Sequence, residues 1–343
     1  MKLLVTSEQN RIDFKSWDEF VGKHPDGTVF QSSEIVQLFQ QTKKFEPIPI
    51  LVTENNNIRG VLLAVIIKEY AGTLGFFTSR TVIYGGPIIN TPEEEYDKVL
   101  DLLLKELTRK VKNRSIFIQF RNFSDMEKRK ETFRKNGYYF LERLNYLVDT
   151  SDEQIIKKNI SKSKLRQVKK GLASGAKIIS PQNEGQVKEF YQILYKLYKY
   201  KVKKPLPDYS FFKSFYKQSE KSRLGIIRLI EYENKIIGGI VSPISKGKVI
   251  YEWYICGLDQ DYKNLYPSIL ATWAAIDYAQ KNNIQSFDFM GVGTPDKDYG
   301  VREFKAKFGG EMVNYGRFGR INNEFLYAIT EVGYNILSMM KRI

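Results

Sequence analysis

The sequence contains one cysteine and one histidine among its 343 residues, Cys256 and His24. An internal disulfide and a zinc site built from cysteine and histidine are therefore excluded, as is any histidine-based catalytic triad that does not use His24. His24 precedes the turn sequence PDG, and Cys256 lies in the apolar run VIYEWYICGL, so we interpret both as structural residues. We expect no metal and no cofactor.

Long apolar segments are missing too. The longest uninterrupted run is VLLAVII, residues 61–67, which is far shorter than the roughly 20 residues that cross a bilayer. The N-terminal MKLLVTSEQN does not have the composition of a signal peptide. No phosphate-binding loop, dinucleotide motif, metalloprotease helix or nucleophile elbow is present. We expect a cytoplasmic protein whose membrane contact is peripheral, at the inner face of the cell membrane.

What the chain has in excess is positive charge. It has 54 lysines and arginines against 39 aspartates and glutamates, which gives a net charge of +15. This balance favours an anionic partner, and charge alone leaves nucleic acid, a phosphorylated substrate and an acidic membrane surface open. The length suggests two domains, and an apolar content of 42% is enough to form a core in each.

The same order of elements occurs twice. Residues 48–67 and 226–245 each consist of two apolar strands around a polar turn, which predicts a β-hairpin. A strand, a helix, a second strand and a short helix with a closing strand then follow in both copies, at 81–89, 92–113, 115–120 and 129–149, and at 248–258, 267–283, 286–290 and 301–321. This agreement favours a tandem duplication. We predict two related α/β domains, residues 1–150 and 151–343.

Residues 299–311, YGVREFKAKFGGE, form the best candidate site. They follow the apolar strand at 286–290 and a glycine-rich turn, at the strand end where α/β sheets bind ligands. Lys305 is flanked by Phe304 and Phe308, so the rings can pack inward and hold the ammonium at the edge of a pocket. The alternative is that the cations of this stretch are ordinary solvated side chains.

The order of elements in each copy resembles the GNAT superfamily of N-acyltransferases. Members that use coenzyme A bind its pyrophosphate through a glycine-rich turn before the helix that follows the central strand. Here those turns are GGPIINTPEE and GLDQDYKNLYPS, which lack the glycine spacing, and Pro267 removes an amide. The sequence therefore disfavours acyl-CoA as the donor.

The chain also resembles the FemABX family of aminoacyltransferases. The resemblance is carried by SKSKLRQVKKGLASGAKI, KPLPDYSFF, YEWYICGLDQDYKNLYPSILATWAAIDYA, FDFMGVG and YGVREFKAKFGGEMVNYG, and more weakly by FQSSEIVQLFQ, KKFEPIPILV and YGGPIIN. It implies two tandem GNAT-like domains with mixed sheets and, since no heptad run is present, a compact member without a coiled-coil arm. It further implies transfer of an amino acid from aminoacyl-tRNA to an amine on the stem peptide of a nucleotide- or lipid-linked muropeptide precursor. That transfer needs positioning and oxyanion stabilisation rather than a cysteine or histidine.

The resemblance implies roles for individual residues. Lys305 corresponds to a lysine that steadies negative charge near the tRNA end or on the developing oxyanion, and we assign it as catalytic. Substrate binding is assigned to Lys204, Tyr209, Tyr254, Lys43, Phe45, Asn90 and Phe304. Asn90 stands where the family often has aspartate, and an amide cannot act as a general base. Asp288 is the best remaining carboxylate, with capping of the following turn as the competing explanation.

Two other functions stay open at this level. One is an N-acyltransferase of the same double fold that uses another donor or another amine acceptor. The other is a non-catalytic protein that binds polyanions through its net charge.

Overall fold

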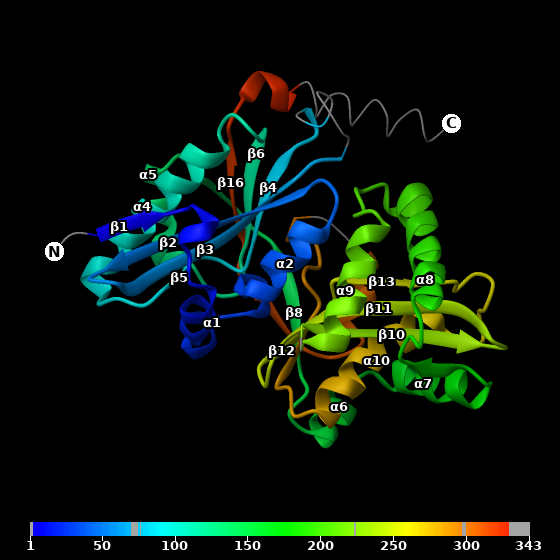
Figure 1. Ribbon diagram of the computed structural model, residues 1–343. Helices are drawn as coiled ribbons and strands as arrows, with labels where there is room; N and C mark the ends of the chain where they lie inside the picture. The colour runs from blue at the N-terminus through cyan, green and yellow to red at the C-terminus, as the bar shows by residue number, and fades with distance from the viewer. Residues whose placement is uncertain (1–2, 70–74, 76, 223, 297–299, 329–343) are drawn as a thin grey trace. The chain divides into compact units, whose positions relative to one another are not determined.

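The computed structural model describes residues 3–69, 75, 77–222, 224–296 and 300–328, which form two α/β units (Figure 1). The first unit combines the chain up to Glu142 with the part from Tyr315 onward, and the second comprises Arg143–Asn314. This division differs from the expected domains 1–150 and 151–343, because each unit includes one strand from the other side of the expected boundary.

The first unit has one mixed sheet with helices on both faces. Its elements are β1 (Leu3–Thr6), η1 (Gln9–Arg11), α1 (Phe14–Lys23), η2 (Val29–Gln31), α2 (Ser33–Gln41), β2 (Phe45–Glu54), β3 (Asn57–Ile67), β4 (Arg80–Tyr84), β5 (Ile88–Ile89), α4 (Glu93–Val111), β6 (Phe117–Arg121), η3 (Glu127–Arg129), α5 (Lys130–Lys135), β7 (Tyr139–Leu141) and β16 (Arg317–Ile321). The strand order is β1-β2-β3-β4-β6-β16-β7, with β5 also paired to β3.

The second unit repeats this plan with additional helices. Its elements are β8 (Leu144–Asp149), α6 (Glu153–Asn159), α7 (Lys162–Ala173), β9 (Lys177–Ile179), α8 (Glu184–Leu197), the π-helix η4 (Tyr198–Val202), α9 (Tyr209–Lys221), β10 (Gly225–Tyr232), β11 (Lys235–Ser245), β12 (Val249–Tyr251), β13 (Tyr254–Gly257), α10 (Pro267–Lys281), β14 (Ser286–Asp288), α11 (Gly300–Ala306) and β15 (Glu311–Asn314). The strand order is β15-β8-β14-β12-β11-β10-β9, with β13 also paired to β11.

The units differ from the expected domains through β8 and β16. β8 lies between β14 and β15 in the second sheet, and β16 lies between β6 and β7 in the first. β8 and β16 occupy equivalent positions in the two sheets, because each pairs with a short outer strand on one side and with the rest of its sheet on the other. Without it, the backbone groups facing that gap would lose their hydrogen bonds, so each sheet requires the strand.

The two predicted hairpins are confirmed, and they share their irregularities. β2 and β3 are joined through Asn55 and Asn56, which have φ of 50° and 64°, and β10 and β11 through Glu233 and Asn234, with φ of 48° and 60°. Two successive residues with positive φ form the tight turn that matches strand twist. The register of each hairpin shifts three residues before the turn. A shared bulge at the same place supports the duplication inferred from sequence.

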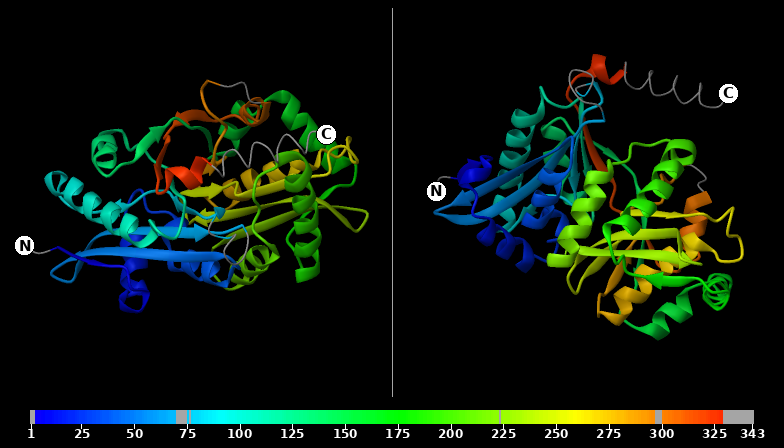
Figure 2. Two further views of the ribbon diagram at one scale, coloured as in Figure 1. Left: turned by 90° about the horizontal axis from the view of Figure 1, so that it is seen from above. Right: turned by 45° about the vertical axis from the view of Figure 1, so that its right-hand side comes forward.

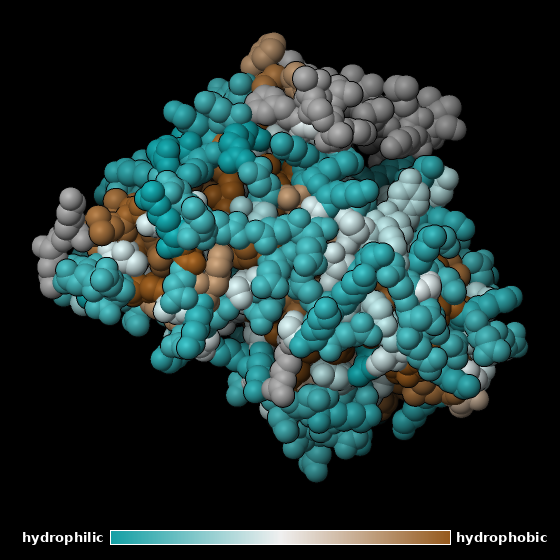
Figure 3. Space-filling model, viewed as in Figure 1, coloured by the Kyte–Doolittle hydropathy of each residue, from teal (hydrophilic) through white to brown (hydrophobic). Residues whose placement is uncertain are grey.

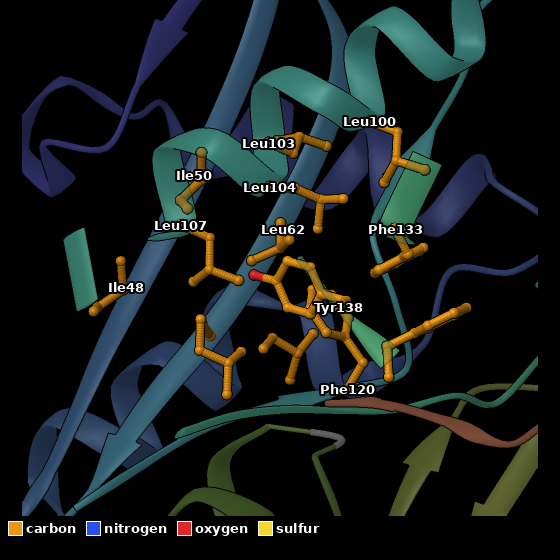
Figure 4. Packing of buried hydrophobic residues seen from close by; sticks show 14 of the residues in the cluster. Ile48, Ile50, Leu62, Leu100, Leu103, Leu104, Leu107, Phe120, Phe133 and Tyr138 are labelled. Carbon is orange, nitrogen blue, oxygen red and sulfur yellow. The ribbon is translucent and has the colours of Figure 1, made fainter. Parts of the chain in front are cut away.

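The core of the first unit lies between its sheet and α4. Alternate residues of the hairpin, among them Ile50 and Leu62, point toward Leu103 and Leu107 of α4 (Figure 4), as a strand period of two and a helical period of 3.6 require. A β-carbon on Gly60 would lie 2.8 Å from the side chain of Val99, so helix and sheet approach closely there. Helices α1 and α2 cover the opposite face (Figure 2).

The second unit is also covered on both faces. Ile240 belongs to the cluster that packs against α10, where Leu270 and Ile276 are fully buried. The preceding residue, Gly239, faces the other way, since a β-carbon there would lie 3.0 Å from the ring of Phe190 in α8. Each fully buried aliphatic or aromatic side chain contributes about 1.5–3 kcal/mol. None of the described helices has the length and hydropathy required to span a membrane, and hydrophilic side chains cover most of the face in Figure 3.

Candidate functional site at the carboxyl end of strand β14

The expected strand at 248–258 is broken in the middle of the second sheet. β12 runs parallel to β14 as far as the pair Tyr251 and Asp288, and the amide of Glu252 still donates to the carbonyl of Asp288 at 2.9 Å. From Tyr254 on, the chain pairs with β11 as β13. Glu252 therefore lies where the two parallel strands part, at the carboxyl end of β14, where α/β sheets bind ligands.

Lys305 of α11 reaches this point and is held by three acceptors. Its Nζ lies 2.8 Å from Oε1 of Glu252 and donates to the carbonyls of Phe289 at 2.9 Å and Gly291 at 3.2 Å. The two charged side chains are only 12% and 4% exposed. An ammonium has three protons, and these contacts account for all of them. The geometry thus gives Lys305 the task of fixing Glu252 and the turn after β14, and its predicted action on the oxyanion stays a prediction.

Burial raises the pKa of both carboxyl groups at this strand end. For Glu252, desolvation raises the pKa, while the charge of Lys305 and hydrogen bonds from Lys305 and Thr272 oppose the rise. For Asp288, desolvation raises the pKa to about 6, against a hydrogen bond from Asn145 and the amide of Met290. Groups with pKa values brought toward neutrality are suited to proton transfer.

Asp288 caps the turn that follows β14. Its Oδ1 accepts from the amide of Met290 at 2.5 Å and from Nδ2 of Asn145 at 2.6 Å. The other end of the Asn145 amide group accepts from the amide of Gly291 at 2.8 Å. These contacts are the ones expected if Asp288 caps the turn, which was the competing explanation for this residue in the sequence analysis. Asn145 belongs to β8, so the strand that crosses the expected domain boundary supplies part of this site.

Substitution of Asp288 by asparagine is expected to flatten the pH dependence of stability. Since the folded pKa is about 6 against an ordinary value of 3.8, the folded protein binds a proton more tightly than the unfolded chain. The free energy of unfolding should therefore fall by about 3 kcal/mol as the pH rises from about 4 to about 6. Asparagine keeps Oδ1 as the acceptor and cannot titrate.

Urea denaturation of the wild type and Asp288→Asn at pH 4, 5, 6 and 7 measures this difference. The two curves of stability against pH should converge toward pH 4 and separate at higher pH, with the wild type falling more steeply. Parallel curves would contradict the assignment of Asp288 as a titrating buried group.

Tyr254 and Tyr209 lie in an aromatic cluster formed with α8 and α9. The ring of Tyr254 is 5.2 Å from that of Phe212, which is 5.3 Å from Tyr191, and Tyr191 is 5.5 Å from Tyr209. The hydroxyl of Tyr209 donates to the carbonyl of Glu184 at 3.1 Å. The structure therefore brings these two predicted residues into one cluster. Tyr254 packs toward α9, whereas Glu252 hydrogen-bonds with α10 on the other side of the sheet.

Lys204 and Phe304 occupy separate positions in the second unit. Lys204 is exposed on the segment between the π-helix and α9. Phe304 precedes Lys305 in α11, but its ring packs with Phe308 at 5.5 Å and lies 3.8 Å below the ammonium of Lys164. α11 thus presents Lys305 to the strand end and Phe304 to α7.

The three remaining predicted residues lie in the first unit and are not all together. Lys43 is exposed just before β2, and Phe45 opens that strand opposite Ile67. The amide of Asn90 donates to the carbonyl of Arg59 at 3.0 Å. Residues 59 and 67 are separated along β3 by about 26 Å at about 3.3 Å per residue. Asn90 is therefore placed away from Lys43 and Phe45, and the substrate-binding roles of all three stay predictions.

The first unit has the same strand break with different side chains. β4 runs parallel to β6 as far as Tyr84 and Arg121, and the amide of Gly85 donates to the carbonyl of Arg121 at 2.9 Å. Gly85 therefore corresponds to Glu252, and Arg121 to Asp288. The side chain at this strand break in the first unit is the fully buried Gln31, which donates to the carbonyl of Tyr84 at 3.1 Å. The buried carboxylate that suits proton transfer thus occurs in the second unit.

The amino end of α10 is occupied by a side chain of the protein itself. Pro267 stands at the first helical position and has no amide. The next amide and hydroxyl, both of Ser268, donate to Asp259 at 3.0 and 2.5 Å. A carboxylate at this place repels a second anion, and it already accepts from the amide and hydroxyl of Ser268.

The interpretation of His24 and Cys256 as structural residues agrees with their surroundings. His24 lies 3.1 Å from the carbonyl of Ile89 through Nε2 and accepts from the amide of Asp26 through Nδ1 at 3.1 Å. Cys256 is buried, and desolvation raises the pKa of its thiol, which disfavours the reactive thiolate.

Glu252 and Lys164 are the residues that the sequence reasoning missed. A signal for Glu252 was present, because it is the one charged residue in the apolar run VIYEWYICGL. A charge inside a buried strand is costly and is retained where it has a partner or a task. Lys164 gave no such signal, since it lies among many other cations in a basic helix.

The chain is similar to a known family in its second half and to solved structures over nearly its whole length. The FemAB family model matches residues 229–335, which include β11 to β14 and α11. No curated protein matches the sequence. The crystal structure of FemX is similar over 96% of this chain and 99% of FemX, with a TM-score of 0.70 and 14% identity.

Two further solved structures share the fold. A tandem GNAT protein from the clavulanic acid biosynthesis pathway has a TM-score of 0.58 and 8% identity, covering 94% of this chain and 99% of the other. L-PGS from Bacillus licheniformis has a TM-score of 0.57 and 11% identity, with coverage of 94% and 96%. These likenesses confirm the predicted fold class, an α/β chain of two GNAT-like units with mixed sheets.

Proposed function

We propose that this chain is an aminoacyltransferase of peptidoglycan cross-bridge formation, because the FemAB family model matches its residues 229–335. The proposed donor is aminoacyl-tRNA, and the proposed acceptor is an amine on the stem peptide of a nucleotide- or lipid-linked muropeptide precursor. The observation that supports the proposal most is the buried pair of Glu252 and Lys305 at the carboxyl end of β14, inside the matched segment.

The reaction requires one proton to leave the acceptor amine. The amine nitrogen attacks the ester carbonyl carbon of the donor, the new C–N bond forms, and the C–O bond to the tRNA ribose breaks as its hydroxyl takes up a proton. We assign Glu252 as the acceptor of the amine proton and Lys305 as the residue that positions it. Desolvation raises the pKa of Glu252, which makes its carboxylate a stronger base.

Charge at α10 supports RNA over coenzyme A as the donor. Asp259 already accepts from the amide and hydroxyl of Ser268, and a pyrophosphate there would meet its carboxylate at close range. The net charge of +15 agrees with a polyanionic donor and with peripheral contact at an anionic membrane surface. On this proposal the protein acts in the cytoplasm, at the inner membrane face when its precursor is lipid-linked.

A transfer assay tests the proposal. Radiolabelled aminoacyl-tRNA is incubated with the protein and a nucleotide-linked muropeptide precursor, and the label is followed into the precursor. Transfer is expected, and it should disappear when the stem-peptide amine is acetylated beforehand. Acetyl-CoA is offered as a competing donor. Acetylation of the amine without aminoacyl transfer would favour a different N-acyltransferase, and tRNA binding without turnover would favour the polyanion-binding alternative.

A further inference from the structure

A second lysine, outside the pair with Glu252, is buried against α11. Lys164 lies in the first turn of α7 and is 5% exposed. Its Nζ lies 3.8 Å from the ring centre of Phe304 and 5.3 Å from that of Phe308. α11 is thus flanked by two ammonium groups, that of Lys305 at the strand end and that of Lys164 over Phe304.

The two ammonium groups differ in their partners. The ammonium of Lys305 contacts a carboxylate and two carbonyls, whereas the ammonium of Lys164 makes no hydrogen bond or ion pair with the residues that the structure describes. Burial and the charge of Lys307 lower the pKa of Lys164 to about 8, against the more distant charge of Asp259, which raises it. Contact with aromatic rings stabilises such an ammonium by about 2 kcal/mol. Burying the ammonium without a hydrogen-bond acceptor costs several kcal/mol, which is more than the rings offset. Among the described residues, the Lys164 ammonium therefore lacks an acceptor within hydrogen-bond distance, although the carboxylate of Asp259 acts on it from farther away.

The exposed face of α7, opposite the buried face that carries Lys164, is cationic. Lys162 and Arg166 are exposed on this outer face, as are Lys169 and Lys170 one turn beyond Arg166. Positions four apart share a helix face, and these four extend over about 12 Å at 1.5 Å per residue. A row of this length suits a phosphate polymer better than a single diphosphate.

We propose that Lys164 binds a backbone phosphate of the donor RNA, with the cationic outer face of α7 contacting further phosphates. This inference rests on the proposed function and names a contact of its donor. The phosphate supplies the hydrogen-bond acceptor that the Lys164 ammonium lacks among the described residues, and it brings the RNA beside α11 and the strand end that carries Glu252. Lys164 is a binding residue on this account and takes no part in proton transfer.

Lys164→Met tests the proposal, because methionine keeps the length and packing of the side chain and removes its charge. Binding of tRNA is measured over a series of salt concentrations. The dissociation constant is expected to rise about tenfold, since a hydrogen bond to a charged group is lost. The slope of log K against log salt should shrink by about 0.7–0.9, the value for one phosphate contact. The melting temperature of the free variant should equal or exceed that of the wild type.

Lys188→Met is the matched control, since Lys188 is an exposed lysine of α8 in the same unit, and it should keep the wild-type slope. Lys162→Met/Arg166→Met changes only exposed side chains and should lower the slope by about twice the single value. In transfer kinetics, Lys164→Met should raise KM for aminoacyl-tRNA and leave KM for the precursor unchanged.

Several results would overturn the proposal. One is a salt slope of Lys164→Met equal to that of the wild type, and another is an equal loss of tRNA affinity in Lys188→Met. A rise in KM confined to the precursor would indicate that Lys164 binds the diphosphate of the precursor. Failure of Lys164→Met to fold would show that the lysine stabilises the free protein. Wild-type protein that neither binds tRNA nor transfers from it would instead refute the proposed function itself.

Discussion

Replacement of Lys305 by alanine should lower the free energy of unfolding by about 3–5 kcal/mol, because it leaves the carboxylate of Glu252 buried without its cation. The carbonyls of Phe289 and Gly291 also lose their donor, so the turn after β14 is loosened at the same time. Urea denaturation of the wild type and the variant at pH 7 measures the difference.

A double variant separates the loss of the pair from the loss of the side chain. Lys305→Met/Glu252→Gln removes both charges and keeps similar volumes, so it should recover most of the stability that Lys305→Ala loses. Lys188→Ala, at an exposed position, should stay within about 0.5 kcal/mol of the wild type. Equal stabilities of Lys305→Ala and Lys188→Ala would show that the buried pair does not exist in solution.

Glu252→Gln should reduce kcat for aminoacyl transfer by about 10²- to 10⁴-fold, the range for loss of a general base. The amide oxygen can still accept from Lys305, but an amide cannot take up the proton of the acceptor amine. In the wild type, burial raises the pKa of Glu252, so activity should be lost as the pH falls through that raised value. This acid limb of the kcat profile should be absent from the residual activity of the variant.

Asp288→Asn is the control for this experiment, because it also neutralises a buried carboxyl group at the same strand end. Since Asp288 caps a turn through an oxygen that asparagine retains, the variant should keep kcat within about tenfold of the wild type and should keep the acid limb. Turnover of Glu252→Gln close to that of the wild type would show that Glu252 is not the general base. Lys305 would then be the remaining candidate catalytic residue of this pair.

Much of the fold follows from local patterns. The hairpins at 48–67 and 226–245 are readable because apolar alternation and polar turns act over a few residues. The helix at 267–283 is readable for the same reason, and the structure places it at Pro267–Lys281. The predicted strands at 81–89 and 248–258 were each too long, because β4 and β12 end where their parallel partners end and the chain then pairs with the other side.

The site was predicted less completely than the fold. The stretch around Lys305 was found because it follows a strand end, yet the three acceptors of its ammonium could not be foreseen from neighbouring residues. Glu252 lies far from Lys305 in the sequence, and Asn145 reaches Asp288 from β8, on the far side of the expected boundary. The seven predicted binding residues came from family positions, and pairing along β3 separates Asn90 from Phe45.

The sequence by itself determined the two hairpins, the repeated order of strands and helices, and the excess of positive charge, because each depends on residues close together in the chain or on their sum. Only the tertiary structure decided that β8 and β16 complete the two sheets, that Lys305 neutralises Glu252, and that the Lys164 ammonium lies over Phe304 with no hydrogen-bond acceptor among the described residues. These depend on which distant segments share a sheet or pack together, and hydrogen-bond completion and the cost of burying charge select those partners.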